Sequence, residues 1–446
     1  MRPSFPTDGN QLDLFRAHFE QMLNPDHPLV VLAQKIDWAR FDAAFADCYS
    51  PDMGAPAKAI RLLVGLHYLK HAFDESDESV VARWLENPYW QCFCGFTTMQ
   101  HELPLHPTSM AKWRKRVGVE KLALLLQETI AVAVREKHVS PQELEQVNVD
   151  TTVQAKNITY PTDSKLFYKA ITKLAKAAKS RGIRLRQTYV RVAKIAAIKA
   201  SRYAHAKQFR RMRGQLRFLR TRLGRMLRGF GRCVAHPDEH LRSLLDLCWR
   251  LFRQQPNDRR KLYSLDEPEV VCISKGKAHQ RYEFGQKISI ATTNRRNWVL
   301  GALLCPGNPY DGHTLAATLA LAERNTGVRP TDAFVDKGYR GHDCHGGAKI
   351  HIAGASNSGV SRALRRRRRR RSAVEPLIGH MKSDHRMGRC FLKGLVGDAL
   401  NAILAAAGLN FRKLLRFVLA LIFRLVGAVQ GRTLPQRCTN LLALAA

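Results

Sequence analysis

The sequence has few acidic side chains for its length. Its 446 residues contain 37 Asp and Glu against 73 Lys and Arg, which gives a formal net charge of +36 and a pI near 10.3. A chain this basic binds polyanions by releasing their counterions. We therefore expect nucleic acid as the leading partner, with an anionic membrane surface as the alternative.

Long apolar runs and paired cysteine motifs are also missing. No segment reaches the ~18 uninterrupted apolar residues that a membrane-spanning helix needs. The nearest candidate, residues 414–427, is interrupted by Arg416 and Arg424. The first ten residues lack the apolar core of a secretion signal, and the ten cysteines include no Cys-x-x-Cys pair. We expect a cytoplasmic protein with neither a zinc framework nor a disulfide scaffold.

The composition nevertheless supports packed domains. With 45% hydrophobic residues, the chain can build packed cores, and its length allows roughly two to four domains. Helical spacing dominates the first part, and short strands recur later, which predicts an α/β protein. We expect a helical N-terminal domain at residues 1–140 and a tail at residues 426–446. Between them we expect a core at residues 141–162 and 263–425, which a basic helical insertion at residues 163–262 interrupts.

Residues 1–140 are expected to bind DNA or to help assembly. Apolar residues at helical spacing predict a helix over residues 55–73 and a second helix over 80–86. After a turn-rich stretch, Ser109 is the expected N-cap of a basic helix over residues 110–117. This order suggests a unit like a helix-turn-helix. The alternative is an ordinary helical bundle with a solvated charged face.

The basic insertion follows the first expected strand. Residues 147–153 alternate, with Asn148, Asp150 and Thr152 on one face, which predicts a half-buried strand. Residues 165–237 then contain 22 Lys and Arg and no Asp or Glu, while apolar residues recur at helical spacing. We expect long basic helices whose like charges repel until phosphates neutralise them. A solvated basic face without a ligand is the alternative.

Later segments complete the expected core. Strand patterns occur at residues 270–274, 282–292, 298–304, 333–336 and 348–353, and helical patterns at 315–323 and 372–387. Three carboxylates stand out by context: Asp150 on the first strand, Asp336 at the carboxyl end of a later strand, and Glu375 at the start of a helix. In α/β sheets, strand ends and nearby helix starts line the active crevice. Converging there, these acids could hold two Mg²⁺ ions that cleave a phosphodiester.

Each acid also has an ordinary structural explanation as a turn or first-turn residue. Other acids are weaker candidates: Asp384 points away from Glu375, Asp332 lies at the wrong end of its strand, and Asp163 and Asp311 fit turns or helix caps. On the helix that follows the arginine run, the spacing places four residues on one stripe suited to metal and phosphate, namely Arg371, Glu375, Lys382 and Arg386.

Arginine and aromatic residues near these acids have two interpretations each. The seven consecutive arginines at residues 365–371 either follow the DNA backbone or form a solvated loop. Trp298 and Tyr339 could each stack on a flipped base, and the alternative for Trp298 is the core of the sheet.

Five motifs, in this order, resemble those of DDE transposases from bacterial insertion sequences, most closely insertion-sequence family five. The resemblance spans about residues 40 to 415. The matching segments are Val147-Asn148-Val149-Asp150-Thr151-Thr152, Lys275-Gly276-Lys277-Ala278-His279 with Tyr282-Glu283-Phe284-Gly285, Gly307-Asn308-Pro309-Tyr310-Asp311-Gly312-His313-Thr314, Asp336-Lys337-Gly338-Tyr339-Arg340-Gly341, and Arg371-Ser372-Ala373-Val374-Glu375-Pro376 followed by Lys382.

The resemblance implies an RNase H-like core, a mixed sheet flanked by helices, in which Asp150, Asp336 and Glu375 bind two Mg²⁺ ions that Mn²⁺ can replace. It implies a transposase that cuts double-stranded DNA at the ends of its element and joins the 3′-hydroxyl to target DNA, as at least a dimer. The family's Tyr position is occupied here by Arg368. The expected DNA contacts are Lys382, Arg371, Arg368, Arg386, Arg340 and Tyr339. A nuclease that does not join, or an inactive DNA-binding relic, remains open.

Overall fold

The computed structural model describes residues 17–50, 56–274, 281–355 and 358–429, without the side chains of residues 422–429. The motif at residues 275–279 and most of the expected tail, residues 430–446, lie outside the described residues. The described chain divides into two compact units, residues 1–154 with 287–446, and residues 155–286. The division falls within two long strands, β1 (Gln146–Lys156) and β3 (Tyr282–Thr293).

The first unit begins with helices. They are α1 (Phe19–Met22), α2 (Pro28–Lys35), α3 (Trp38–Phe45), α4 (Ile60–Ala72), α5 (Asp77–Glu86), α6 (Pro88–Phe93), α7 (Pro107–Arg135) and α8 (Pro141–Leu144). A reciprocal capping box between Ser76 and Ser79 starts α5, because each side chain satisfies a free N–H at the helix end. Helix α7 begins at Pro107 after the cap His106, so the expected cap Ser109 is wrong. Gly118, with φ of 78°, breaks this long helix.

The basic part of α7 is only partly a surface. Arg114, expected on a DNA-facing helix, is buried and makes a two-pronged ion pair with Asp77, at 2.9 and 2.5 Å. Lys70 donates to the same carboxylate at 2.7 Å. The two cations hold the pKa of Asp77 well below its usual range, against the opposing effect of its burial. Lys112, Lys115 and Arg116 remain exposed.

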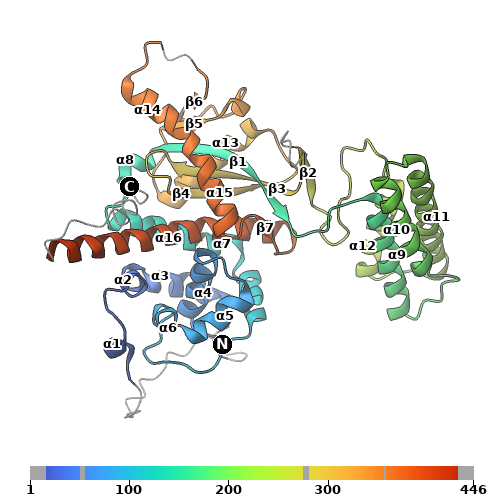
Figure 1. Ribbon diagram of the computed structural model, residues 1–446, viewed down its shortest axis with the longest axis horizontal. Coiled ribbons are helices and arrows are strands. Elements are labelled where there is room, and N and C mark those ends of the chain that lie inside the picture. Colours follow the sequence, from blue (N-terminus) through green and yellow to red (C-terminus); the bar gives the residue numbers. More distant parts are fainter. Residues whose placement is uncertain (1–16, 51–55, 275–280, 356–357, 430–446) are drawn as a thin grey trace. The chain divides into compact units, whose positions relative to one another are not determined.

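A mixed sheet, which apart from β2 and the ends of β1 and β3 belongs to the same unit, forms its centre (Figure 1). Its strands run in the order β2-β3-β1-β5-β6, with β4 paired to β3 and β7 to β1. β1 pairs in parallel with β5, and β5 with β6, whereas β3 is antiparallel to β4 and β2. The strands not yet delimited are β2 (Val271–Ser274), β4 (Val299–Cys305), β5 (Asp332–Val335), β6 (Lys349–Ile352) and β7 (Arg389–Cys390).

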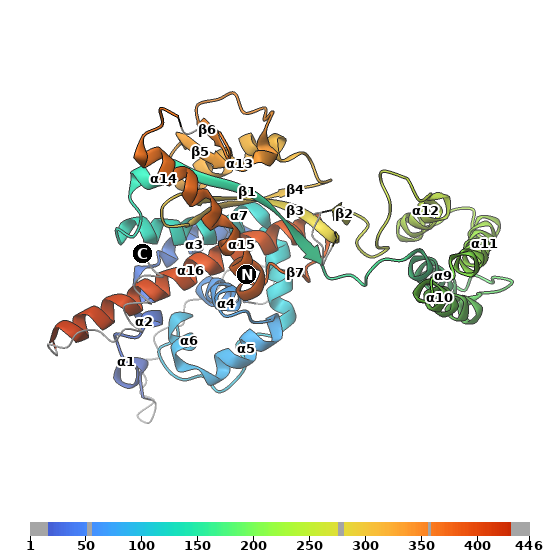
Figure 2. The ribbon, with the colours of Figure 1, turned by 45° about the horizontal axis from the view of Figure 1, so that its top comes forward.

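Helices cover both faces of this sheet (Figure 2). On one face, Thr318 of α13 (Asp311–Thr326) donates to Ser289 of β3. On the other, Gln154 of β1 donates to the Asp398 carbonyl oxygen of α16 (Gly394–Val429) at 3.0 Å. Asn148, Thr152 and Gln154 on this face of β1 are buried too, whereas Asp150 is half-buried. The expected half-buried strand is wrong because covered sheets bury both faces. Helices α14 (Arg362–Arg370) and α15 (Val374–Asp384) lie between β6 and β7 in the sequence.

Helix α16 joins the sheet to the N-terminal helices. It packs against β4 and also against α2, α4 and α7 (Figure 1). By length and composition it could cross a membrane, but 78% of its most apolar stretch is buried inside the protein, as in a core helix. Because this one helix packs against both regions, the N-terminal helices and the sheet fall in the same compact unit. The boundary expected after residue 140 stays a prediction.

The second unit is built around four helices, α9 (Asp163–Ser180), α10 (Val190–His205), α11 (Phe209–Cys233) and α12 (Glu239–Arg253). Helix α9 packs against the other three, and α11 packs against α10 and α12. Their shared core holds Leu174, Leu223, Leu227 and Phe230, which recur at helical spacing in the sequence. The compact unit, residues 155–286, is wider than the expected insertion of residues 163–262 because the loops and β2 that flank the helices belong to it.

Candidate active site at the ends of the central strands

Asp150 lies near the middle of β1, and Asp336 follows directly after β5. The parallel register pairs Gln146 with Asp332 and Asn148 with Phe334, an offset of 186 residues. The same offset carries Asp150 to Asp336, and neighbouring strands are about 4.8 Å apart. Two residues that are distant in the sequence are thus brought side by side at the end of β5.

Local hydrogen bonds fix both carboxylates. Asp150 Oδ1 accepts from the backbone N–H of Thr151 at 2.8 Å. Asp336 caps the short helical turn at residues 337–339, and its Oδ1 accepts from the N–H of Gly338 at 2.8 Å. Such contacts restrict the side chains to one orientation without consuming all their oxygen lone pairs. Both carboxylates can therefore accept further ligands.

Glu375 reaches the same place through an arginine. It lies in the first turn of α15 with 66% of its side chain exposed. The guanidinium of Arg371 lies 3.5 Å from Glu375 Oε1 and 3.8 Å from Asp150 Oδ2. Arg371 consequently bridges the two acids and partly neutralises them.

The ionisation of Asp150 reflects this environment. Burial raises its pKa to about 6, and the negative charges of Asp336 and Glu375 act in the same direction. The Thr151 hydrogen bond and Arg371 oppose the rise. Asp336 and Glu375 are therefore close enough to Asp150 to act on it electrostatically, and Asp150 itself has little access to solvent.

A fourth acid, Asp311, belongs to this group. Its Oδ1 accepts from the Thr151 hydroxyl at 2.9 Å and from Lys287 Nζ at 2.8 Å. A Cβ at Gly338 would lie 3.3 Å from Asp311 Oδ2 and 3.0 Å from Asp336 Oδ1, so both carboxylates face that glycine. The sequence interpretation of Asp311 as a helix cap is wrong, because Tyr310 is the N-cap of α13 and the Asp311 side chain turns to β1 and β3. In the sequence, the signal that could have placed Asp311 in the site is its position in the matched motif at residues 307–314.

The aromatic candidates are interior residues. Tyr339 is 1% exposed, so it cannot stack on a flipped base in this conformation. Its burial, together with the charges of Asp150 and Asp311, raises the pKa of the Tyr339 hydroxyl far above its usual range. Trp298 is also fully buried, with its ring stacked 6.0 Å from that of Phe417, which confirms its interpretation as core.

The residues predicted to contact DNA differ in their exposure and position. Arg340 is exposed beside the site, while Arg368 of α14 and Lys382 of α15 are partly buried. Arg386 is not on the predicted stripe. Helix α15 ends at Asp384, and Arg386 adopts a left-handed conformation, with φ of 64°, that turns its guanidinium to the Asp74 carbonyl oxygen at 2.9 Å.

The arginine run is helical. Residues 362–370 form α14, so the solvated-loop alternative is wrong for this stretch. Arg366, Arg367 and Arg370 line a hollow together with Asn294 and Arg295. Arg367 also lies 4.0 Å from Asp332, the acid at the start of β5, whose other oxygen contacts His351 Nε2 at 2.6 Å. The helix thus presents positive charge at the start of β5, the opposite end of that strand from Asp336.

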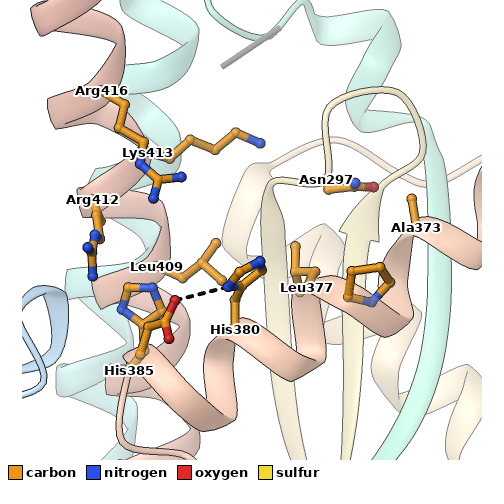
Figure 3. Close-up of a pocket in the computed structure, with 11 residues that line it drawn as sticks. Asn297, Ala373, Leu377, His380, His385, Leu409, Arg412, Lys413 and Arg416 are labelled. Atoms are coloured by element: carbon orange, nitrogen blue, oxygen red, sulfur yellow. Dashed lines mark hydrogen bonds and ion pairs between the residues drawn. The ribbon is translucent and has the colours of Figure 1, made fainter. Parts of the chain in front are cut away.

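A separate pocket lies between α15, which contributes Leu377 and His380, and α16 (Figure 3). Three cations of α16, Arg412, Lys413 and Arg416, line one wall. Burial lowers the pKa of Lys413 to about 8. Asp384 lines the pocket too, and its Oδ2 lies 2.9 Å from His380 Nδ1. Asp384 is therefore not part of the group around Asp150.

The donor set suits a hard divalent cation, because carboxylate oxygens are its preferred ligands. Asp150, Asp336 and Glu375 supply such oxygens, and the charges of Asp336 and Glu375 add to the effect of burial in raising the pKa of Asp150. In the described part of the chain, no three His, Cys, Asp or Glu side chains are already gathered closely enough to hold a metal ion. The guanidinium of Arg371 contacts Asp150 and Glu375, two of the three residues that would hold the metal.

Comparisons with known proteins agree with this chemistry. Residues 17–116 match a family model described as a transposase domain (DUF772), and residues 347–415 match one described as a transposase DDE domain. The second match contains Glu375; neither contains Asp150 or Asp336. A protein of Rhizobium meliloti described as "Uncharacterized protein ORF8 in nfe locus" is 54% identical over 209 residues, which cover 47% of this chain and 100% of that protein. No solved structure matches.

The matches at both ends of the chain define a transposase. The chain belongs to the DDE insertion-sequence transposases. Its assignment to insertion-sequence family five stays a prediction, because neither matching model nor the relative carries that name.

Proposed function

We propose that this transposase binds the ends of its element, hydrolyses the terminal phosphodiester and joins the resulting 3′-hydroxyl to target DNA. The observation that carries the proposal is that the register of β1 and β5 sets Asp336 beside Asp150, while Arg371 contacts both Asp150 and Glu375. An RNase H-like arrangement of the sheet, double-stranded DNA as partner, and a dimer or larger assembly belong to the same proposal. So does a cytoplasmic location close to the nucleoid.

The three carboxylates would hold two Mg²⁺ or Mn²⁺ ions. Such ions polarise the phosphodiester and stabilise the leaving oxygen. The chain itself contributes position and charge. Asp150 and Asp336 are fixed by the Thr151 and Gly338 N–H groups, and Lys287 neutralises the neighbouring Asp311. Arg371, freed from Asp150 and Glu375, would hold a phosphate with its planar guanidinium, and Lys382 would add a second positive charge.

The overall reaction needs no oxidant and no covalent protein–DNA intermediate. In the first step, water attacks phosphorus and the 3′-hydroxyl leaves with a proton. In the second step, that hydroxyl attacks a target phosphodiester, and one new P–O bond replaces the bond that breaks. Removing one group that stabilises developing charge typically costs about 10²–10³-fold in rate.

The test uses labelled duplexes that carry the element's ends, supercoiled target DNA and Mg²⁺. We expect wild type to cleave and join, and Glu375→Gln to lose both by at least about 10²-fold while still binding DNA. Asp384→Asn is the matched control, since it removes an acid from the same helix outside the carboxylate group.

Each other result has a distinct meaning. Cleavage without joining in wild type would identify a nuclease instead. Binding without cleavage by either protein would identify an inactive relic. Equal activity of wild type and Glu375→Gln would remove Glu375 from the site.

A further inference from the structure

The inserted helical unit contains a hollow of 690 Å³ between the α9–α10 loop and the last turns of α11. Five arginines line it. Two come from the loop, and three come from one face of α11, at spacings of three and four residues: Arg184, Arg186, Arg225, Arg228 and Arg232. The cations therefore come from two separate elements and face a shared space.

The loop is anchored so that its arginines turn outward. Ile183 and Leu185 pack against the core of the four helices, and they alternate with Arg184 and Arg186. A Cβ at Gly229 of α11 would lie 3.5 Å from Leu185, so the loop and the helix are in close contact there. Tyr189, at the end of the loop, lies under the Arg222 guanidinium at 5.5 Å. The hollow is thus held by packing.

Its charge has no counterpart within the hollow. Residues 165–237 contain no Asp or Glu, and the lining includes none. Arg181, in the same loop, shows what a local acid does, because it makes a two-pronged ion pair with Asp238 at 2.7 and 3.1 Å. None of the ion pairs found among the described residues involves the five arginines of the hollow. Like charges that line one hollow repel one another, and a bound polyanion removes that repulsion.

We propose that this hollow binds phosphates of the DNA backbone. Guanidinium groups form paired hydrogen bonds with phosphate oxygens, and a cluster of five favours a chain of phosphates over a single carboxylate. Backbone contacts of this kind position the duplex without reading its sequence. The inference rests on the proposed transposase function, because it gives the insertion a defined part in holding the DNA.

The same helix supplies a matched control. Arg210, Arg213 and Arg217 are exposed at the other end of α11 and do not line the hollow. We compare R225Q/R228Q/R232Q with R210Q/R213Q/R217Q in the full-length protein. Both triple variants remove three positive charges from one helix. Circular dichroism and a thermal melt establish that each remains folded.

The measurement is the affinity for a duplex of unrelated sequence over a range of salt concentrations. Each phosphate contact contributes about 0.9 to the slope of log affinity against log salt. The hollow variant should lower that slope by about two to three and weaken binding at least about tenfold near 0.1 M salt. The control should change the slope by less than about one. Equal changes in the two variants would overturn the inference.

Cys233 gives a second measurement, because it lines the hollow and is exposed. DNA should slow its alkylation several-fold in wild type and in the control, but not in R225Q/R228Q/R232Q. Inorganic tripolyphosphate is the competing probe. Stronger protection by tripolyphosphate than by an equal phosphate concentration of DNA would identify a small-polyphosphate site and overturn the assignment to DNA.

The two proposals fail in different ways. An unchanged salt slope in R225Q/R228Q/R232Q, with cleavage of element ends intact, would overturn only the hollow. Salt-sensitive binding through the hollow without cleavage in wild type would support the hollow and count against the transposase reaction.

Discussion

The catalytic unit and the inserted helical unit concentrate charge of opposite sign by different means. Around Asp150, the parallel register of β1 and β5 brings acids together in a buried place. Around Arg228, helical periodicity and an anchored loop gather arginines in a hollow of the surface. Grouped like charges cost energy in both places. The comparison suggests that each group is completed by a ligand of opposite charge, divalent cations in the first and phosphates in the second.

The largest expected effect tests whether the two units are stabilised independently. Phe230 of α11 is fully buried in the core of the inserted unit. Phe230→Ala should destabilise that unit by about 3–5 kcal/mol through lost burial and the cavity left behind. Limited proteolysis with mass spectrometry should then find new cleavage confined to residues 155–286.

Phe209→Ala is the control, since Phe209 lies in the same helix and is 54% exposed. It should change the free energy of unfolding by less than about 0.5 kcal/mol. Cleavage spreading through the sheet strands in Phe230→Ala would show that the two units unfold together, and the comparison would lose its basis.

The charges of the inserted unit could be recognised from the sequence, whereas the complete catalytic group could not. The absence of acids and the helical spacing of apolar residues are both local patterns in the sequence, so they predict basic helices over residues 165–237. The polar face of a strand indicates Asp150, a strand end indicates Asp336, and each acid lies in a matched motif. Their adjacency, however, depends on a register between residues 186 positions apart, which no local pattern contains.

Three misassignments have identifiable physical causes. Acids are common at helix starts, which predicts a cap at Asp311, but its carboxylate is held by Thr151 and Lys287 from two strands. Arg386 was placed on a helical stripe that the chain leaves after Asp384. Tyr339 follows an exposed-looking glycine motif, yet it turns into the core. Each error concerns a contact between distant elements or the end of an element.

The second-largest expected effect is a change in the stability of the protein with pH and with the removal of metal ions. Asp150 has a pKa of about 6 in the folded protein against 3.8 for an unperturbed group, mainly because of burial. The folded state thus binds this proton more tightly than the unfolded state, and stability falls as pH rises from about 4 to about 6. At about 1.4 kcal/mol per pKa unit, the loss is about 3 kcal/mol.

We expect urea unfolding in EDTA to show this loss in wild type and to show less of it in Asp150→Asn. Asp384→Asn is a control of opposite sign. Its hydrogen bonds with Ser383 and His380 hold the pKa of Asp384 below its usual value, so its contribution to stability is lost as pH falls. Added Mg²⁺ should reduce the wild-type loss above pH 6, because metals bind the ionised carboxylate. An identical pH dependence in wild type and Asp150→Asn would contradict the assigned burial.

The smallest expected effect tests how precisely the acids are placed. Gly338 has no room for a side chain without movement, since a Cβ would lie 3.0 Å from Asp336 Oδ1 and 3.3 Å from Asp311 Oδ2. Gly338→Ala should displace the Asp336 carboxylate by a few tenths of an ångström and slow cleavage about tenfold, or about 1.4 kcal/mol in the barrier.

Gly346→Ala is the matched control for this substitution, because a Cβ there meets nothing within 4 Å. It should cleave at the wild-type rate. DNA affinity should be unchanged in both variants, since the arginines of the inserted unit are untouched. A Gly338→Ala protein with full activity would show that the acids tolerate displacement. Cleavage would then not require the carboxylates around Gly338 to be held in exact positions.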